Sequence, residues 1–301
     1  MLTSLQLRGV FPAIPTPVNP DDTIHADAAR ALLRYLLKQG VDGVVPLGGT
    51  GEYGALSRAE RIRMAEITAK EANGTIPVVA GVLDPGYHDA MQAGKDFAAA
   101  GVDGLLVLTP YYTNPTQAGI RDYFMRYADE SPLPILIYEI PYRTRIAIAP
   151  EVLHELSRHE RIIGMKACNT DMWHFLRTVA GVDDSFAVLS GEDTLFPLHV
   201  AAGARGGIVV TASLLPSAWR TIYRLAADGK TQEALALHRS LIPLMIMAFA
   251  ETNPGPMKSV MDLIGVDAPT LLAPLVPADA ALSENLRVEL RKQLDLFERG
   301  L

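Results

Sequence analysis

The chain has 301 residues, of which 49% are hydrophobic and 20% are charged, a globular composition that excludes a disordered or fibrous protein. Its 27 Lys and Arg against 34 Asp and Glu give a formal net charge of −7, and no basic cluster stands out, so we expect no nucleic-acid partner. No apolar run reaches the roughly 18 residues that a membrane span requires, and no secretory signal is recognisable. Because the single cysteine, Cys168, cannot form an internal disulfide, we expect a cytoplasmic protein without a membrane partner.

Short apolar runs and helical patterns alternate along the first 212 residues. The runs, which we interpret as strands, cover residues 9–18, 41–48, 76–82, 102–109, 133–140, 161–168, 186–191 and 206–212. The helical patterns between them cover residues 28–39, 57–72, 87–100, 116–130, 150–159, 171–180 and 193–202. The second helical pattern opens on Ser57-Arg58-Ala59-Glu60, a capping-box pattern. Most of the runs are continuously apolar, which is typical of parallel strands covered on their outer side.

Eight strand-helix units over about 220 residues predict a (β/α)8 barrel, an α/β fold of the TIM type. A doubly wound open sheet is the alternative, but its glycine-rich G-x-G-x-x-G turn is absent after the first strand. The pattern becomes purely helical after about residue 216. We therefore expect a catalytic barrel over residues 1–228 and a C-terminal helical region over residues 229–301.

Lys166 is the unusual residue of the sixth predicted strand. Functional side chains of such barrels cluster where strands end, and a lysine inside an apolar strand is rarely buried without a reason. Burial disfavours the charged ammonium and lowers its pKa, so the free amine can attack a ketone and form a Schiff base. The alternative is an ammonium that reaches solvent or pairs with a carboxylate. Cys168 faces the same side two residues later, and we interpret it as a packing residue.

Three further segments lie at predicted strand ends. The turn from Gly48 to Glu52 offers backbone N–H groups before a helix, an arrangement that holds anions. Because the phosphate-loop spacing is missing, a carboxylate fits better, with a plain tight turn as the alternative. Tyr138 precedes Lys166 by one strand-helix unit and could relay protons, or simply pack in the core. Arg143 suits a second substrate carboxylate, or a surface ion pair.

The histidines show no metal-binding spacing, so we expect no metal site. Taken in order, the motifs of the chain resemble the dihydrodipicolinate synthase / N-acetylneuraminate lyase family of Schiff-base-forming pyruvate aldolases. The segments that carry the resemblance are Thr16-Pro17, Gly49 to Glu52, Pro110-Tyr111-Tyr112, Tyr138 to Thr144, Gly164 to Lys166, Leu189 to Asp193, Gly207 to Ala212 and Glu251 to Lys258.

The resemblance implies a role for each matching residue in the active site of the same chain. Lys166 would be the Schiff-base lysine and Tyr138 the proton-relay tyrosine above it. Thr50 and the backbone N–H of Gly49 would hold the carboxylate of a 2-oxo acid such as pyruvate, and the carbonyl of Ile208 would border the same pocket. No cofactor is implied, because the reaction proceeds through the covalent Schiff base on the lysine.

The resemblance also implies assembly and a second substrate. Tyr112 would be a catalytic residue that reaches across a dimer interface into the neighbouring chain's site, within a homotetramer built from two dimers. Arg143 matches the arginine that binds the carboxylate of the aldehyde acceptor in the synthase branch.

One position departs from the family's pattern and leaves the substrate open. The synthase usually has a hydroxyl residue that links the two relay tyrosines, and this chain has Gly49 there, which cannot pass a proton. The first hypothesis is a lyase that condenses pyruvate with an aldehyde, as in 4-hydroxy-tetrahydrodipicolinate (dihydrodipicolinate) synthesis. The second, which Gly49 favours, is a dehydratase or aldolase for a 2-keto-3-deoxy sugar acid. A barrel that binds a 2-oxo acid without turnover is the third.

Overall fold

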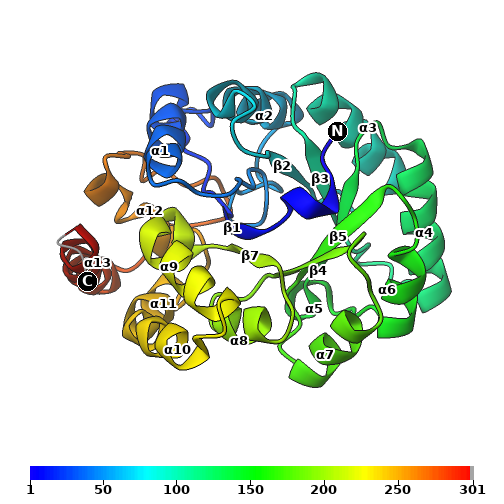
Figure 1. The fold of residues 1–301 in the computed structure, drawn as a ribbon. Helices are drawn as coiled ribbons and strands as arrows, with labels where there is room; N and C mark the ends of the chain where they lie inside the picture. Colours follow the sequence, from blue (N-terminus) through cyan, green and yellow to red (C-terminus); the bar gives the residue numbers. More distant parts are fainter. Residues whose placement is uncertain (299–301) are drawn as a thin grey trace.

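The computed structural model describes residues 1–298, and its centre is a ring of parallel strands surrounded by helices (Figure 1). The seven regular strands form one sheet in the order β1-β7-β6-β5-β4-β3-β2. Their bounds are β1 (Gly9–Pro12), β2 (Val79–Val82), β3 (Gly104–Leu108), β4 (Ile135–Glu139), β5 (Ile162–Ala167), β6 (Ala187–Ser190) and β7 (Gly206–Val209). Every residue of these strands is buried, which explains why their sequences read as continuous apolar runs.

Residues 42–46 close the ring between β1 and β2. Val45 forms a parallel bridge with Ala13, and Val44 forms one with Val78. The Val45 N–H donates to the Pro12 carbonyl at 2.9 Å, and Val44 accepts from the Val79 N–H at 3.0 Å. This segment does not become a regular strand because Pro46 has no N–H to donate. Seven of the eight predicted strands are regular strands, and bridged residues take the place of the remaining one, predicted at 41–48, so the (β/α)8 barrel is confirmed.

Eight helices follow the strands around the outside of the ring, as Figure 1 shows. They are α1 (Ala26–Lys38), α2 (Arg58–Ala72), α3 (Tyr87–Ala99), α4 (Gln117–Glu130), α6 (Pro150–Leu156), α7 (Met172–Ala180), α8 (Phe196–Ala201) and α9 (Pro216–Ala227). A short helix after β4, α5 (Pro141–Thr144), had no counterpart among the predicted elements. Three 3₁₀ turns cover Ser4–Gln6, Thr211–Ser213 and Met261–Ile264.

Only half of the predicted capping box forms at the start of α2. The Ser57 hydroxyl accepts from the Glu60 N–H at 3.2 Å. The Glu60 carboxylate does not reach back to Ser57 but accepts from the Ile24 N–H at 2.6 Å. The glutamate thus ties the loop before α1 to α2, a long-range contact that a local pattern does not reveal.

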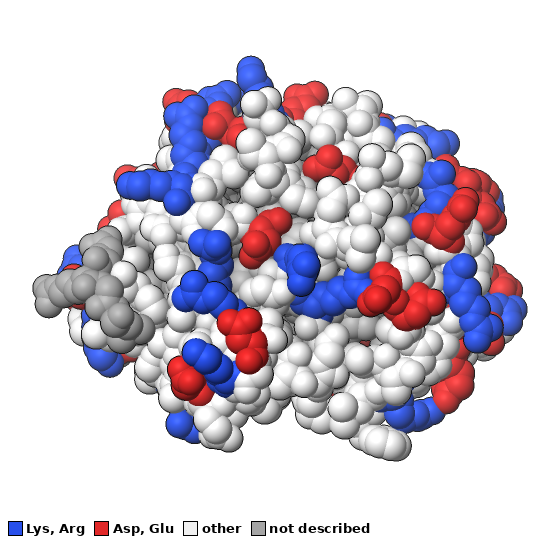
Figure 2. Space-filling model, viewed as in Figure 1, with Lys and Arg blue, Asp and Glu red and all other residues white. Residues whose placement is uncertain are grey.

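The C-terminal elements lie on one side of the ring, in yellow through orange to red in Figure 1. They are α10 (Thr231–Ser240), α11 (Ile242–Ala248), α12 (Gly255–Lys258) and α13 (Ala280–Glu298). Within residues 1–298, no helix is long and apolar enough to cross a membrane. Lys and Arg side chains alternate with Asp and Glu over the face drawn in Figure 2, with no continuous basic surface among the described residues there. The division of the chain at residue 228 stays a prediction.

A buried ion pair connects the C-terminal region to the barrel. The Lys258 ammonium binds the Glu52 carboxylate and donates to the Thr270 carbonyl at 2.7 Å, and both charged residues are under 5% exposed. The second Glu52 oxygen accepts from the Leu272 N–H at 2.7 Å. Burial lowers the pKa of Lys258, and the Glu52 carboxylate opposes that shift. The turn that carries Glu52 is therefore held in place by the C-terminal region.

We predict that Lys258→Met lowers the free energy of unfolding by about 3–5 kcal/mol, because it leaves the buried Glu52 carboxylate without its counter-charge. Urea unfolding followed by circular dichroism measures the change. The matched control is Lys292→Met, since Lys292 pairs with Glu289 while 61% exposed, and an exposed pair contributes under about 1 kcal/mol. Equal effects of the two substitutions would show that the buried pair does not stabilise the fold.

Candidate active site

A cavity of about 770 Å³ lies where the barrel strands end. The ends of β4, β5 and β6, the turn at residues 49–50, and residues 245–253 of the C-terminal region line it. Lys166 and Tyr138 lie among its lining residues, together with Thr50, Gly49 and Arg143. Five of the seven site residues expected from the sequence are thus brought to one cavity.

Lys166 and Tyr138 are register partners on the neighbouring strands β5 and β4. Both side chains are buried, and the Lys166 Nζ lies 4.6 Å from the centroid of the Tyr138 ring. No carboxylate forms an ion pair with Lys166 among the residues that the structure describes. The arrangement keeps an amine and a phenol side by side, close enough for a proton to pass between them directly or through one water molecule.

The pKa of Lys166 depends on the charges of its neighbours. Burial acts to lower this pKa, whereas ionised Tyr138, ionised Cys168 and the Asp193 carboxylate act to raise it, and with all three charged it lies above its ordinary value. Burial raises the pKa of Tyr138, and it raises the pKa of Cys168 to about 12, so both groups are neutral near pH 7. Burial by itself favours the nucleophilic free amine of Lys166; neutral Tyr138 and Cys168 no longer oppose this effect, whereas the Asp193 carboxylate still does.

The turn at residues 48–52 is held so that its polar groups face the cavity. The Gly51 N–H donates to the Gly48 carbonyl at 3.1 Å, and the Thr16 hydroxyl donates to the Gly51 carbonyl at 2.7 Å. The Thr50 hydroxyl accepts from the Asn253 side-chain amide at 2.8 Å. Because this hydrogen bond uses an acceptor site of Thr50, the hydroxyl proton is free to be donated to a bound carboxylate.

Arg143 lies on α5 and lines the cavity. Its Nη1 atom is only 2.7 Å from the place that a Cβ on Gly49 would occupy. Arg143 forms no ion pair with any described carboxylate, so its guanidinium is available to a ligand. The absence of a side chain at Gly49 therefore makes room for the arginine, which the sequence alone did not show.

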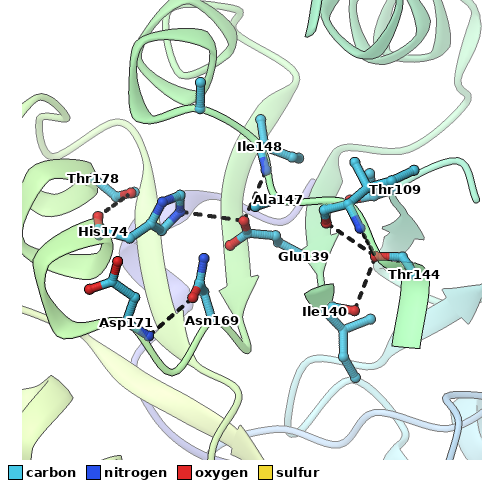
Figure 3. A network of polar contacts seen from close by, with 12 residues as sticks. Thr109, Glu139, Ile140, Thr144, Ala147, Ile148, Asn169, Asp171, His174 and Thr178 are labelled. Atoms are coloured by element: carbon cyan, nitrogen blue, oxygen red, sulfur yellow. Dashed lines mark hydrogen bonds and ion pairs between the residues drawn. The ribbon is translucent and has the colours of Figure 1, made fainter. Parts of the chain in front are cut away.

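A buried polar network behind β4 holds α5 and Tyr138 in place (Figure 3). The Thr144 hydroxyl donates to the Ile140 carbonyl at 3.1 Å and closes the turn that carries Arg143. Glu139, which points away from the side occupied by Tyr138, accepts from the Ile148 N–H at 3.0 Å and lies 3.3 Å from His174. Hydrogen bonding to Glu139 raises the pKa of His174. The strand end is thus anchored to the segments around α6 and α7.

Ile208 and Tyr112 do not line this cavity. Ile208 is fully buried on β7, and Val210, two residues later, reaches the cavity instead. Tyr112 is 90% exposed and has a φ of 71°, a left-handed conformation that bulky residues seldom adopt. The expected roles of the Ile208 carbonyl and of Tyr112 at a partner's site stay predictions.

Three cavity residues were missed as candidates from the sequence: Tyr142, Glu192 and Asn253. Glu192 follows β6, so the strand-end rule had already selected its segment without singling out the carboxyl group. Asn253 comes from the C-terminal region, to which that rule does not apply. Within residues 1–298, no group of three or more His, Cys, Asp or Glu side chains is arranged to hold a metal ion.

The closed barrel and the buried lysine at the ends of its strands define a lyase of the class I aldolase type. The chain belongs to the dihydrodipicolinate synthetase family, whose model matches residues 6–293. The 4-hydroxy-tetrahydrodipicolinate synthase of Methanothrix thermoacetophila is 36% identical over 290 residues, which cover 96% of this chain and 98% of that one. The Bacillus subtilis enzyme of the same name is 33% identical, covering 95% and 98%.

Solved structures agree with this assignment. Dihydrodipicolinate synthase from Thermotoga maritima matches with a TM-score of 0.93 at 31% identity, covering 97% of this chain and all of that one. The synthase from Acinetobacter baumannii, solved in complex with pyruvate, matches with a TM-score of 0.92 at 28% identity, covering 96% of this chain and 100% of that one. The family expected from the sequence motifs is confirmed.

We predict that Cys168 is unreactive in the folded protein. The thiol is 1% exposed and donates to the Gly191 carbonyl at 3.3 Å, and burial raises its pKa to about 12. A thiolate is the reacting form, so the native chain should not react with Ellman's reagent at pH 8, and the urea-unfolded chain should release one equivalent. Because the chain has one cysteine, any rapid native labelling would contradict its assignment as a packing residue.

Proposed function

We propose that the protein is a Schiff-base lyase that condenses pyruvate with an aldehyde, as a 4-hydroxy-tetrahydrodipicolinate synthase does. The observation that carries the proposal is a buried Lys166 amine without an ion-pair partner among the described residues, in one cavity with the turn at Thr50 and the unpaired Arg143 guanidinium. One cavity thus offers a nucleophile and two separate sites for carboxylates. The names of the relatives and the pyruvate complex of the Acinetobacter enzyme support the same reading.

The geometry suggests the order of the chemical steps. Thr50 and the N–H groups of its turn hold the pyruvate carboxylate, so that the ketone faces the Lys166 amine. Attack forms a carbinolamine, which loses water to give an iminium, and the Tyr138 phenol next to the amine moves the protons. Loss of a C3 proton then gives an enamine, which attacks the aldehyde of the second substrate. Arg143 binds the carboxylate of that substrate as a charge-assisted pair.

A second candidate uses the same lysine with a different substrate. A 2-keto-3-deoxy sugar acid would bind through its own ketone and then lose water or be cleaved. Gly49 favours this reading, because it supplies no hydroxyl for the proton relay of the synthase. We also infer, from the family resemblance, a homotetramer in which Tyr112 completes the site of a partner, and a cytoplasmic location.

Borohydride trapping tests the proposed function. Reduction in the presence of pyruvate should attach the substrate carbons to Lys166, which peptide mass spectrometry identifies, and Lys166→Ala should abolish the adduct. The matched control Lys292→Ala, at an exposed lysine, should keep it. A parallel run uses 2-keto-3-deoxy sugar acids. An adduct only with a sugar acid would replace the first candidate by the second, and no adduct with either would rule out the Schiff-base mechanism for these substrates.

We predict that Gly49→Ala weakens binding of the acceptor aldehyde without changing pyruvate trapping. The new Cβ would lie 2.7 Å from the Arg143 Nη1 and would displace the guanidinium. Loss of a charge-assisted hydrogen bond costs enough to raise the acceptor KM by about tenfold. Steady-state kinetics with aspartate semialdehyde measures the change.

Gly48→Ala is the control for this substitution, since a Cβ there meets nothing within 4 Å. It changes the same turn by the same methyl group but leaves Arg143 in place. If both variants raised the acceptor KM equally, the effect would come from the turn and not from the arginine.

A further inference from the structure

Glu192 is a carboxyl group in the cavity that the proposed steps do not yet use. It follows β6, lines the same cavity as Lys166 and is partly buried. Its Oε1 atom is shielded from solvent and has no hydrogen-bond partner within residues 1–298. A buried acceptor without a partner costs free energy, and such atoms often mark a position where a ligand completes the contact.

The other ionisable groups of the cavity either already accept hydrogen bonds from the protein or differ from Glu192 in their proton affinity. Asp193 is occupied by three hydrogen bonds, from the Val210 N–H at 2.9 Å, the Thr211 N–H at 2.8 Å and the Thr211 hydroxyl at 2.7 Å. Glu251 accepts from the Asp279 N–H at 3.2 Å at the exposed rim. The remaining groups that face the cavity or interact with Glu192 are Lys166, Tyr138, Cys168, Tyr142 and Arg143.

These remaining groups differ from Glu192 in their proton affinity. Burial raises the pKa values of Tyr138 and Tyr142, and the pKa of Cys168 to about 12, while an arginine stays charged. Lys166 is used by the Schiff base. Burial raises the pKa of Glu192 to about 7, with Asp193 adding to the shift and Lys166 and Tyr142 opposing it. Near neutrality, Glu192 is therefore the described cavity group that exists in both protonation states.

The relay through position 49 cannot supply a proton to the acceptor. Gly49 has no hydroxyl, and the Arg143 guanidinium fills the space in front of it. The oxygen of an aldehyde that is attacked by the enamine nevertheless needs a proton as the bond forms. A neutral carboxylic acid that lines the same cavity as the arginine proposed to hold the acceptor meets that need.

We propose that Glu192 is the general acid that protonates the aldehyde oxygen of the second substrate while the carbon–carbon bond forms at the enamine on Lys166. This inference rests on the proposed function. The enamine carbon attacks the aldehyde carbon, the electrons of the C=O π bond pass to oxygen, and that oxygen takes the proton of Glu192. The enamine becomes an iminium and Glu192 becomes a carboxylate, which water reprotonates before the next turnover. The unpartnered Oε1 is the atom that contacts the new hydroxyl.

Glu192→Gln tests this role, because it keeps the size of the side chain and removes its acid function. With pyruvate and aspartate semialdehyde as substrates, we expect the kcat for condensation to fall by about 100-fold or more. Borohydride trapping of pyruvate on Lys166, and exchange of the pyruvate methyl protons with deuterium followed by NMR, should stay within about twofold of the wild type. The control Glu251→Gln removes a carboxylate from the rim of the same cavity and should not change condensation.

The pH profile separates an acid from a purely structural group. General-acid catalysis needs the protonated form, so wild-type condensation should lose rate as the pH rises through about 7, and Glu192→Gln should lack this decline. Glu192→Asp should recover part of the rate together with the decline. Condensation by Glu192→Gln within threefold of the wild type, or an equal loss of trapping, exchange and condensation, would overturn the proposal. Absence of any wild-type pyruvate adduct would instead overturn the proposed function, and this inference with it.

Discussion

The site depends on one constraint: the Lys166 amine is buried in the barrel and forms no ion pair with a described carboxylate. The chain contains a direct comparison, because Lys166 and Lys258 are both buried. Lys258 binds the Glu52 carboxylate and the Thr270 carbonyl, and so serves as a structural cation. Lys166 instead lies over the Tyr138 ring, where the phenol is neutral near pH 7. The presence or absence of a paired carboxylate thus distinguishes Lys258, which supports the structure, from Lys166, the proposed nucleophile.

The barrel brings the proposed reacting groups together through strand register, and residues 245–253 of the C-terminal region add to the lining of the same cavity. Parallel pairing of β4 and β5 sets Tyr138 beside Lys166. Asn253 belongs to the segment after α11. Its side-chain amide donates a hydrogen bond to the Thr50 hydroxyl and so orients that hydroxyl. The turn at residues 48–52 belongs to the barrel, but the C-terminal region holds it, because Lys258 and the Leu272 N–H bind its Glu52 carboxylate.

Much of the fold and the centre of the site could be predicted from the sequence, because both follow from local periodicity. Apolar runs at regular spacing predicted the seven regular strands and the bridged segment that closes the ring, and the strand-end rule selected Lys166 and Tyr138 before any resemblance was considered. The contacts that were missed join residues far apart in the chain. The packing of Arg143 against Gly49 and the hydrogen bond of Asn253 to Thr50 have no sequence pattern of their own. The hydrogen bond from the Ile24 N–H to the Glu60 carboxylate is another long-range contact, and for that reason the capping-box pattern did not reveal it.

The tie between Glu52 and residues 258–272 has a consequence for the order in which the protein matures during synthesis. A ribosome makes the whole barrel before it reaches Lys258, so a nascent chain can form every strand while the Glu52 carboxylate still lacks its counter-charge. The substrate-facing turn reaches its final form only when the segment up to Leu272 has emerged and docked. Catalytic competence therefore requires synthesis of the chain through Leu272, and a chain that stops short of this segment lacks the partners that hold the Glu52 turn.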